Sequence, residues 1–306
     1  MTEQKTQAIA GNSDLWKYVD DKKPQIENSL REYLPLAPAK IETKFNEAVE
    51  YILFSGGKRL RPVLTLLGAE LVGGKSETVV PAACAVEFIH TSSLIFDDLP
   101  CMDNADERRG KTSLHAQFGE GLAILAAIGF LNASYGLVFV NHKEMPERAI
   151  RAHAEIVECI GAAGMVGGQS VDLALAKEVN SKDFSNENYD TETIRNLKTS
   201  ALMRLALRVG AILAGANHFE LENLSRFAGF LGGAYQLSDD LLDLEEDGKI
   251  FQSNKTFAVN KGQDAAQLKL KTIIEQAKQV LIKDFPPNEA RGCLIELTDY
   301  LTERKN

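Results

Sequence analysis

Cysteine is scarce in this chain of 306 residues, and its four cysteines, Cys84, Cys101, Cys159 and Cys293, have neither paired nor metal-ligand spacing. This scatter argues against a disulfide framework and a cysteine zinc site, and it is typical of a reducing compartment. Runs of eighteen uninterrupted apolar residues are also missing, and residues 1–14 are polar without an apolar signal region. The sequence therefore predicts a cytoplasmic protein without stable membrane insertion.

Basic charge is in deficit as well. The chain has 34 lysine and arginine residues against 43 aspartate and glutamate residues, and no basic stripe gathers the cations. This balance argues against a nucleic-acid-binding surface. The length is sufficient for an enzyme with a core of its own.

Strand-like alternation is almost absent, while apolar residues recur at helical spacing. The sequence predicts an all-α fold, a single large helical bundle, in one domain over residues 1–306 with residues 1–13 disordered. Helices are expected over residues 15–34, 41–54, 63–72, 82–96, 122–140, 147–171, 193–214, 220–244, 265–282 and 288–301. The polar segment 177–191 is expected to be an exposed loop. Close helix contacts are expected at Gly161, Gly164, Gly232 and Gly233.

Acidic residues stand where an apolar helix should continue. Asp97 and Asp98 directly follow the apolar residues Leu94-Ile95-Phe96, and burying unpaired charge is costly. Pro100 predicts that the helix ends near Leu99, since proline cannot donate to the helix ladder. A turn at this point would fold Asp103 back toward Asp97.

A second acidic cluster, Asp239, Asp240 and Asp243, lies deep in another helical stretch. Asp239 and Asp243 are four residues apart, so their carboxylates share one helix face. Magnesium takes one or two carboxylates and completes its shell with water and phosphate oxygens. Two such clusters therefore indicate a site for divalent cations that arrive with a polyanionic ligand.

Basic residues are placed to hold anions. The turn Gly56-Gly57-Lys58-Arg59-Leu60-Arg61-Pro62 opens an apolar helix, where backbone donors and positive charge suit an anion. Further unusual polar positions are His90, Arg108, Arg109, Gln169, Asp172, Lys198, Thr199, Gln236 and Lys255. Taken alone each is weak evidence: a lone histidine on an apolar helix is more often a hydrogen-bonded core residue, and paired arginines are often solvated. Gln169 and Asp172 fit a local structural hydrogen bond equally well.

Taken in order, these segments resemble the short-chain trans-polyprenyl diphosphate synthases, the farnesyl and geranylgeranyl diphosphate synthases. The resemblance spans residues 45–258. It is carried by the turn at residues 56–62, His90-Thr91, the segment 97–103, Arg108-Arg109-Gly110, Gly167-Gly168-Gln169, Lys198-Thr199, and Gln236 with the segment 239–243.

The resemblance implies the head-to-tail condensation of isopentenyl diphosphate with an allylic diphosphate, and it implies a homodimer. It implies three magnesium ions per site, held by residues of the two clusters, Asp97, Asp98, Asp103, Asp239, Asp240 and Asp243. Arg108, Lys198 and Lys255 would add charge around the allylic diphosphate. Isopentenyl diphosphate would be held by Lys58, Arg61, His90 and Arg109. Thr199 and Gln236 would turn oxygen dipoles toward the allylic cation, and the released diphosphate would remove the final proton.

Two departures from the family pattern leave alternatives open. Ile128 stands where the family usually has an acid, and Gly248-Lys249 is followed after a short interval by Lys255-Thr256. A weakly active or regulatory subunit is therefore an alternative, although such a subunit would not need two buried aspartate clusters. A class I terpene cyclase is a third candidate, but it would not need the Lys58 and Arg61 patch for a second diphosphate.

The residues before Asp97 bear on product length. Positions four and five residues earlier, Ser93 and Ser92, lie about one helical turn from Asp97. In the resembling enzymes a bulky aromatic residue at this place stops chain growth, so two serines predict the twenty-carbon geranylgeranyl diphosphate. Ile89 and Val86 are expected to form the deeper floor. Phe130 is the opposing candidate, which would restore the fifteen-carbon farnesyl product.

Overall fold

The computed structural model describes residues 14–178, 191–246 and 262–303. Its helices are α2 (Asp14–Glu32), α3 (Phe45–Leu53), α4 (Leu60–Leu71), α5 (Ser76–Asp98), α6 (Leu114–Phe118), α7 (Glu120–Leu137), α8 (Pro146–Ile160), α9 (Met165–Glu178), α10 (Thr191–Ala214), α11 (His218–Glu246), α13 (Gln263–Asp284) and α14 (Glu289–Glu303). Two short strands, β1 (Glu107–Arg108) and β2 (Lys111–Thr112), pair as an antiparallel hairpin. The all-α fold is confirmed for this part of the chain.

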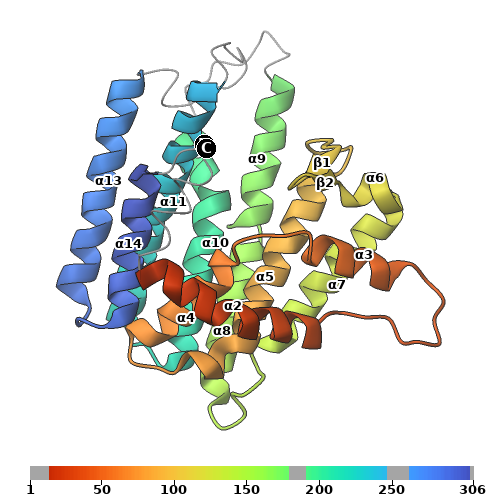
Figure 1. Ribbon diagram of the computed structural model, residues 1–306, viewed down its shortest axis with the longest axis horizontal. Coiled ribbons are helices and arrows are strands. Elements are labelled where there is room, and N and C mark those ends of the chain that lie inside the picture. The colour runs from red at the N-terminus through yellow and green to blue at the C-terminus, as the bar shows by residue number, and fades with distance from the viewer. Residues whose placement is uncertain (1–13, 179–190, 247–261, 304–306) are drawn as a thin grey trace.

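Helix α10 lies at the centre of the bundle. It packs against α4, α5, α8, α9 and α11, and α5 packs in turn against α4 and α7. Figure 1 shows α13 and α14 on one side of these central helices and α3, α6 and the hairpin on the other. Most of α5 is buried, so the helix that carries the first aspartate cluster is held on several sides.

Several predicted helix boundaries, and two of the predicted glycine contacts, were wrong. The run 147–171 is two helices, because Gly161 ends α8 in an extended conformation and a Cβ on Gly164 would lie 2.1 Å from the carbonyl oxygen of Cys159. These two glycines therefore form a break between helices and not a helix contact. The helix predicted from residue 82 begins at Ser76, and the one predicted from residue 41 begins at Phe45. Gly232 does lie at a contact, since its Cβ would meet Ser200 of α10.

By length and composition, two helices in the described ranges could cross a membrane, α5 and α7. The apolar window of α5 is 78% buried within the bundle. Helix α5 is therefore accounted for as a core helix. Only 33% of the corresponding window of α7 is buried, so most of that apolar window is not covered by the described residues.

Helices α4 and α10 approach each other through a reciprocal pair of glycines. A Cβ on Gly210 would lie 1.9 Å from the carbonyl oxygen of Thr65, and one on Gly68 would lie 2.2 Å from that of Leu207. Neither backbone can yield without separating the two helices. The crossing therefore requires glycine on both sides.

Replacing Gly210 by alanine is expected to destabilise the fold by about 3 kcal/mol, the upper part of the range for overpacked cores. Gly229→Ala on α11 is the matched control, because nothing lies within 4 Å of a Cβ at that helical position. The control should be neutral or slightly stabilising. Thermal unfolding followed by circular dichroism measures both, and equal melting temperatures for the two variants would contradict the close crossing.

Candidate functional site

The first aspartate cluster lies where α5 ends. The helix stops at Asp98, as Pro100 predicted, and the chain then turns back on itself. The amide of Asp103 donates to the carbonyl oxygen of Asp97 at 2.9 Å, and the amide of Ala105 donates to that of Asp98 at 3.2 Å. The predicted return of Asp103 toward Asp97 is thereby confirmed at the level of the backbone.

Asp98 faces a different partner. Its carboxylate is almost fully buried and accepts from the Arg108 guanidinium, with Nε at 2.9 Å from Oδ1 and 3.2 Å from Oδ2 and with a second, shorter contact through Nη2. These hydrogen bonds raise the pKa of Arg108 above its ordinary value. The pair ties the β1–β2 hairpin to the end of α5, so both side chains have a structural task beside any role in binding.

The second cluster lies near the end of α11. Figure 1 shows that α5 and α11 run toward the same end of the bundle. Asp239 and Asp240 are half-buried, and Gln236 is half-buried one turn earlier on the same helix. Asp243 belongs to α11, but its side chain lies outside the described part, as do the side chains of Lys198 and Thr199 on α10 and the whole of Lys255.

The aspartate carboxylates suit a magnesium ion that is shared between the protein and a bound phosphate. Among the described residues, no three histidine, cysteine, aspartate or glutamate side chains converge closely enough to hold a metal ion alone. Magnesium typically takes only one or two protein carboxylates and fills its other positions with phosphate oxygens and water. A turn that returns Asp103 to Asp97 supplies two such ligands. The donor set therefore suits an ion that arrives with a phosphate ligand.

The basic turn before α4 depends on its two glycines. Gly56 and Gly57 have φ values of +114° and +128°, a region that side chains disfavour. The Arg109 guanidinium lies directly against them: its Nη1 donates to the carbonyl oxygen of Gly56 at 2.7 Å, and a Cβ on Gly57 would lie 3.0 Å from the same nitrogen. The turn therefore brings Arg109 next to Lys58, two of the residues predicted to hold isopentenyl diphosphate.

Arg59 anchors this turn from within. Its guanidinium is buried and donates to Glu27 of α2, to Glu87 of α5 and to the carbonyl oxygen of Leu53, each at 2.7 Å. Burial alone would lower the pKa of Arg59, but the carboxylates of Glu87 and Glu27 outweigh it and raise the pKa. Its φ of +53° is unusual for a residue with a side chain. Three neighbouring elements thus hold the turn that presents Lys58 and Arg61.

Arg61 and His90 form a pair inside the protein that has further hydrogen-bond donors beyond the contact between them. Arg61 Nη1 lies 3.1 Å from His90 Nε2, and because arginine has only donors, His90 must accept there and carry its proton on Nδ1. Burial, followed by the charges of Arg61 and Arg109, holds the pKa of His90 well below its ordinary value, so the ring is neutral.

Within the described residues, neither His90 Nδ1 nor Arg61 Nε has a hydrogen-bond partner. A buried donor without a partner is costly, and two of them stand here beside the cations of Arg61 and Arg109. This arrangement favours an anion with several acceptor oxygens, as predicted from the sequence.

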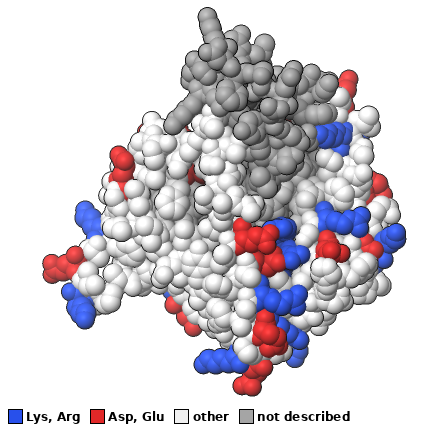
Figure 2. All heavy atoms as spheres, turned by 180° about the vertical axis from the view of Figure 1, so that it is seen from behind, with Lys and Arg blue, Asp and Glu red and all other residues white. Residues whose placement is uncertain are grey.

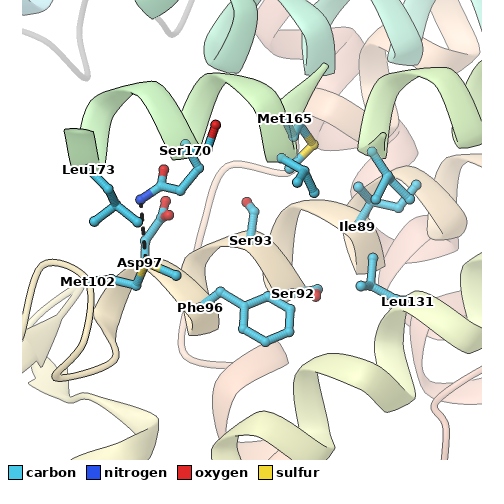
Figure 3. A pocket seen from close by; sticks show the side chains of 13 residues that line it. Ile89, Ser92, Ser93, Phe96, Asp97, Met102, Leu131, Met165, Ser170 and Leu173 are labelled. Carbon is cyan, nitrogen blue, oxygen red and sulfur yellow. Dashed lines mark hydrogen bonds between the residues drawn. The ribbon is translucent and has the colours of Figure 1, made fainter. Parts of the chain in front are cut away.

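An apolar cavity of about 300 Å³ begins at the first aspartate cluster. Figure 3 shows Asp97 and Met102 at one end of the cavity, Ile89 and Leu131 at the other, and Ser92, Ser93 and Phe96 between them. Its volume is at the lower end of the range for small-molecule sites. Gln169 also lines it: the amide nitrogen lies 3.8 Å from Met102 Sδ, and Oε1 is buried without a hydrogen-bond partner among the described residues.

Only some of the residues predicted to limit product length line this cavity. Ile89, Ser92 and Ser93 line it, whereas Val86 is fully buried in the core and is not one of the lining residues. Phe130 does not line it either, because its ring packs against Phe88, with centroids 5.3 Å apart. Leu131 of α7, Ile160 of α8 and several residues of α9, among them Met165, also line it. Sequence reasoning missed these residues, since nothing local marks which residue of a neighbouring helix faces a cavity.

Comparisons with known proteins agree with this site. A family model described as polyprenyl synthetase matches residues 42–281. Geranylgeranyl pyrophosphate synthase 11, chloroplastic, of Arabidopsis thaliana is 44% identical over 239 residues, which make up 77% of this chain and 65% of that protein. A dimethylallyltranstransferase of Fischerella ambigua is 38% identical over 272 residues, 85% of this chain and 76% of that protein. The chain therefore spans a little under two thirds of the first relative.

The fold has solved counterparts. An FPP/GFPP synthase from Zymomonas mobilis superimposes with a TM-score of 0.83 at 28% identity, covering 96% of this chain and 99% of that one. This likeness confirms that the helices are arranged as in that group of synthases.

Proposed function

The chain belongs to the polyprenyl synthetase family, and from that premise we propose that it condenses isopentenyl diphosphate with an allylic diphosphate to a short all-trans prenyl diphosphate. One observation carries the proposal: an apolar cavity starts at Asp97, at the carboxylate-rich end of α5. Such a cavity would accept an apolar prenyl chain, and the aspartates at its end would accept, through magnesium, the diphosphate head of the same molecule. The names of two relatives, a geranylgeranyl pyrophosphate synthase and a dimethylallyltranstransferase, agree with this chemistry.

In the proposed reaction the allylic carbon–oxygen bond breaks, and the resulting cation is attacked by the double bond of isopentenyl diphosphate. Asp97, Asp103 and Asp239 would hold magnesium ions, whose chemistry is to neutralise the departing diphosphate. Arg61, His90 and Arg109 would bind the second diphosphate through the donors described above. Gln169 Oε1 and the predicted dipoles of Thr199 and Gln236 would face the cation, and the released diphosphate would take up the final proton. Preorganised charges of this kind lower the barrier without a protein nucleophile.

Two alternatives are less well supported. Ile128, the residue that suggested a weakened subunit, is 50% exposed on α7 and does not line the cavity. The loss of an acid at that position therefore takes nothing from the described cavity. A terpene cyclase would leave the buried donors of Arg61 and His90 without a second diphosphate to bind.

One assay tests the proposal and both alternatives. The purified chain is incubated with isopentenyl diphosphate and dimethylallyl, geranyl or farnesyl diphosphate, with magnesium or with a chelator. We expect magnesium-dependent consumption of isopentenyl diphosphate and longer prenyl alcohols after dephosphorylation. Cyclic hydrocarbon from the allylic diphosphate alone would indicate a cyclase, and no consumption of either substrate would overturn the proposal.

We also propose that the protein is a homodimer that buries the outer face of α7. Ile124, Leu125 and Ile128 form an exposed apolar stripe on this helix, and a soluble surface rarely leaves such a stripe uncovered. Figure 2 shows a broad area without charged side chains on the left half of the rear face, the half on which α7 lies. A second copy would cover both stripes in one symmetric contact.

Location in the cytoplasm likewise remains a prediction, while plant relatives are named chloroplastic.

Ile128→Glu is expected to convert the dimer to a monomer, because it places a charge in the middle of the buried contact. Leu268→Glu is the matched control, since Leu268 is 68% exposed on α13, away from this stripe. Size-exclusion chromatography with light scattering gives the mass of each variant at equal concentration. A monomeric wild type, or an Ile128→Glu variant that stays dimeric, would contradict the assignment.

A further inference from the structure

The Lys58 ammonium lies beside two aromatic rings that come from opposite ends of the chain. Its Nζ is 5.4 Å from the ring centroid of Trp16 on α2 and 5.3 Å from that of Tyr300 on α14. It also donates a hydrogen bond to the Tyr300 hydroxyl at 2.9 Å. The two rings contact each other edge to face, with centroids 5.1 Å apart. We call Trp16 and Tyr300 the aromatic clamp.

The helices that carry the clamp are fixed to their neighbours. The amide of Leu15, next to Trp16, donates to Glu296 of α14 at 2.9 Å. The carbonyl oxygen of Leu301, next to Tyr300, accepts from the buried hydroxyl of Ser238 on α11 at 3.0 Å. Both rings are therefore placed by helix packing, whereas a lysine side chain on an exposed turn would otherwise sample many rotamers.

Tyr300 of the clamp lines a cavity that Arg61 also lines. A small cavity of about 50 Å³ is lined by Tyr300 together with Arg61 and Tyr235. Tyr300, the hydrogen-bond partner of Lys58, therefore lines the same space as Arg61. An ammonium group has three donors, so the bond to Tyr300 leaves two for a ligand.

We propose that Trp16 and Tyr300 are positioning residues, which hold the Lys58 ammonium beside Arg61 for the diphosphate of the second substrate. The assignment rests on the proposed function for the identity of that substrate. The Trp16 ring attracts the cation, and the Tyr300 hydroxyl accepts a hydrogen bond that fixes its direction, so Lys58 is ordered before the ligand arrives. The clamp also makes this ordering depend on the docking of α2 against α14.

Steady-state kinetics test the clamp. Trp16→Leu and Tyr300→Leu are each expected to raise the KM for isopentenyl diphosphate by about fivefold, the scale of one cation–π contact, with unchanged kcat and unchanged KM for the allylic diphosphate. Tyr300→Phe removes the hydroxyl that Lys58 contacts but keeps the ring against Trp16, and it should give a rise close to that of Tyr300→Leu. Tyr51→Phe is the matched control, because its hydroxyl donates to the Thr112 carbonyl oxygen at 2.9 Å while Lys111 lies 5.6 Å from its ring. A merely structural role would change both KM values, or kcat, along with the melting temperature, and that result would overturn the proposal.

A binding measurement separates failure of the clamp from failure of the proposed function. Trp16 is the one tryptophan in the sequence, so its fluorescence reports on Lys58 without any turnover. Inorganic diphosphate is titrated in the presence of a chelator, which keeps metal-dependent binding out of the signal. We expect a saturable change in the wild type that Lys58→Met abolishes and Lys22→Met, a control 5.4 Å from the Tyr18 ring, preserves. No change in the wild type, or an equal change in Lys58→Met, would overturn the clamp even if the enzyme makes prenyl diphosphates.

Discussion

Replacing Asp97 by alanine is expected to lower kcat by about a thousandfold, equivalent to about 4 kcal/mol of barrier. Asp97 lies at one end of the apolar cavity, and the hydrogen bond from the Asp103 amide to the Asp97 carbonyl oxygen places two carboxylates at the same turn. Losing one of them would remove a magnesium ligand just where the diphosphate departs. The same loss is expected for Asp239→Ala on α11.

The fold of these variants should be preserved, because removing one of two neighbouring carboxylates relieves repulsion between like charges. Asp106→Ala is the matched control: Asp106 is an exposed carboxylate in the same loop, outside the predicted ligand set. Activity and melting temperature are measured together for all three variants. If Asp97→Ala keeps activity within about tenfold of the wild type, little more than 1 kcal/mol of barrier, Asp97 is not a metal ligand.

Local chemistry explains why the first aspartate cluster could be predicted. A proline at position 100 cannot continue the helix, so α5 ends just before it. The backbone amides that follow must find acceptors, and the amide of Asp103 finds one in the Asp97 carbonyl oxygen, which folds the chain back. The basic turn was readable for a similar reason, because two successive glycines allow backbone angles that other residues disfavour. The break between α8 and α9 was missed, since apolar residues continue on both sides of Gly161 and Gly164 and periodicity gives no warning there.

The features that could not be predicted from the sequence depend on contacts between residues far apart in the chain. Lys58 and Tyr300 are 242 positions apart, so no pattern in the sequence connects them. Arg108 was predicted to add charge around the allylic diphosphate, and no sequence pattern showed that it also reaches Asp98 when the hairpin folds against the end of α5. Val86 was expected in the cavity on helical spacing alone. In the structure Val86 turns into the core, and Leu131 and Ile160 lie against the space instead.

The second large effect concerns product length, for which we propose the twenty-carbon geranylgeranyl diphosphate. The cavity runs from Asp97 past Ser92 and Ser93 toward Ile89 and Leu131 (Figure 3). The small side chains of the two serines leave the middle of this path open. Phe130 does not block it, because its ring packs against Phe88. The growing chain can therefore pass the first turn below the diphosphate before it meets the larger apolar side chains.

Ser93→Phe is expected to change the main product from twenty to fifteen carbons, because an aromatic ring would close the cavity about one turn below Asp97. Ser93 is half-buried and its hydroxyl donates only to the His90 carbonyl oxygen at 2.8 Å within the described contacts, so the ring has room to enter the cavity. Ser92→Phe should act in the same direction, but Ser92 is fully buried and the larger residue is expected to cost stability as well. Ser93→Ala serves as the control that removes the hydroxyl and keeps the space.

Chromatography of the dephosphorylated products, with isopentenyl diphosphate in excess, decides the matter. The wild type and Ser93→Ala should give geranylgeraniol, and Ser93→Phe should give farnesol with the first condensation intact. Leu131→Ala tests the opposite end, because removing that side chain from the far wall should let products grow beyond twenty carbons. If the wild type already stops at farnesol, the wall formed by Leu131, Ile160 and Ile89 is the limit, and Leu131→Ala rather than the serines should then release the twenty-carbon product.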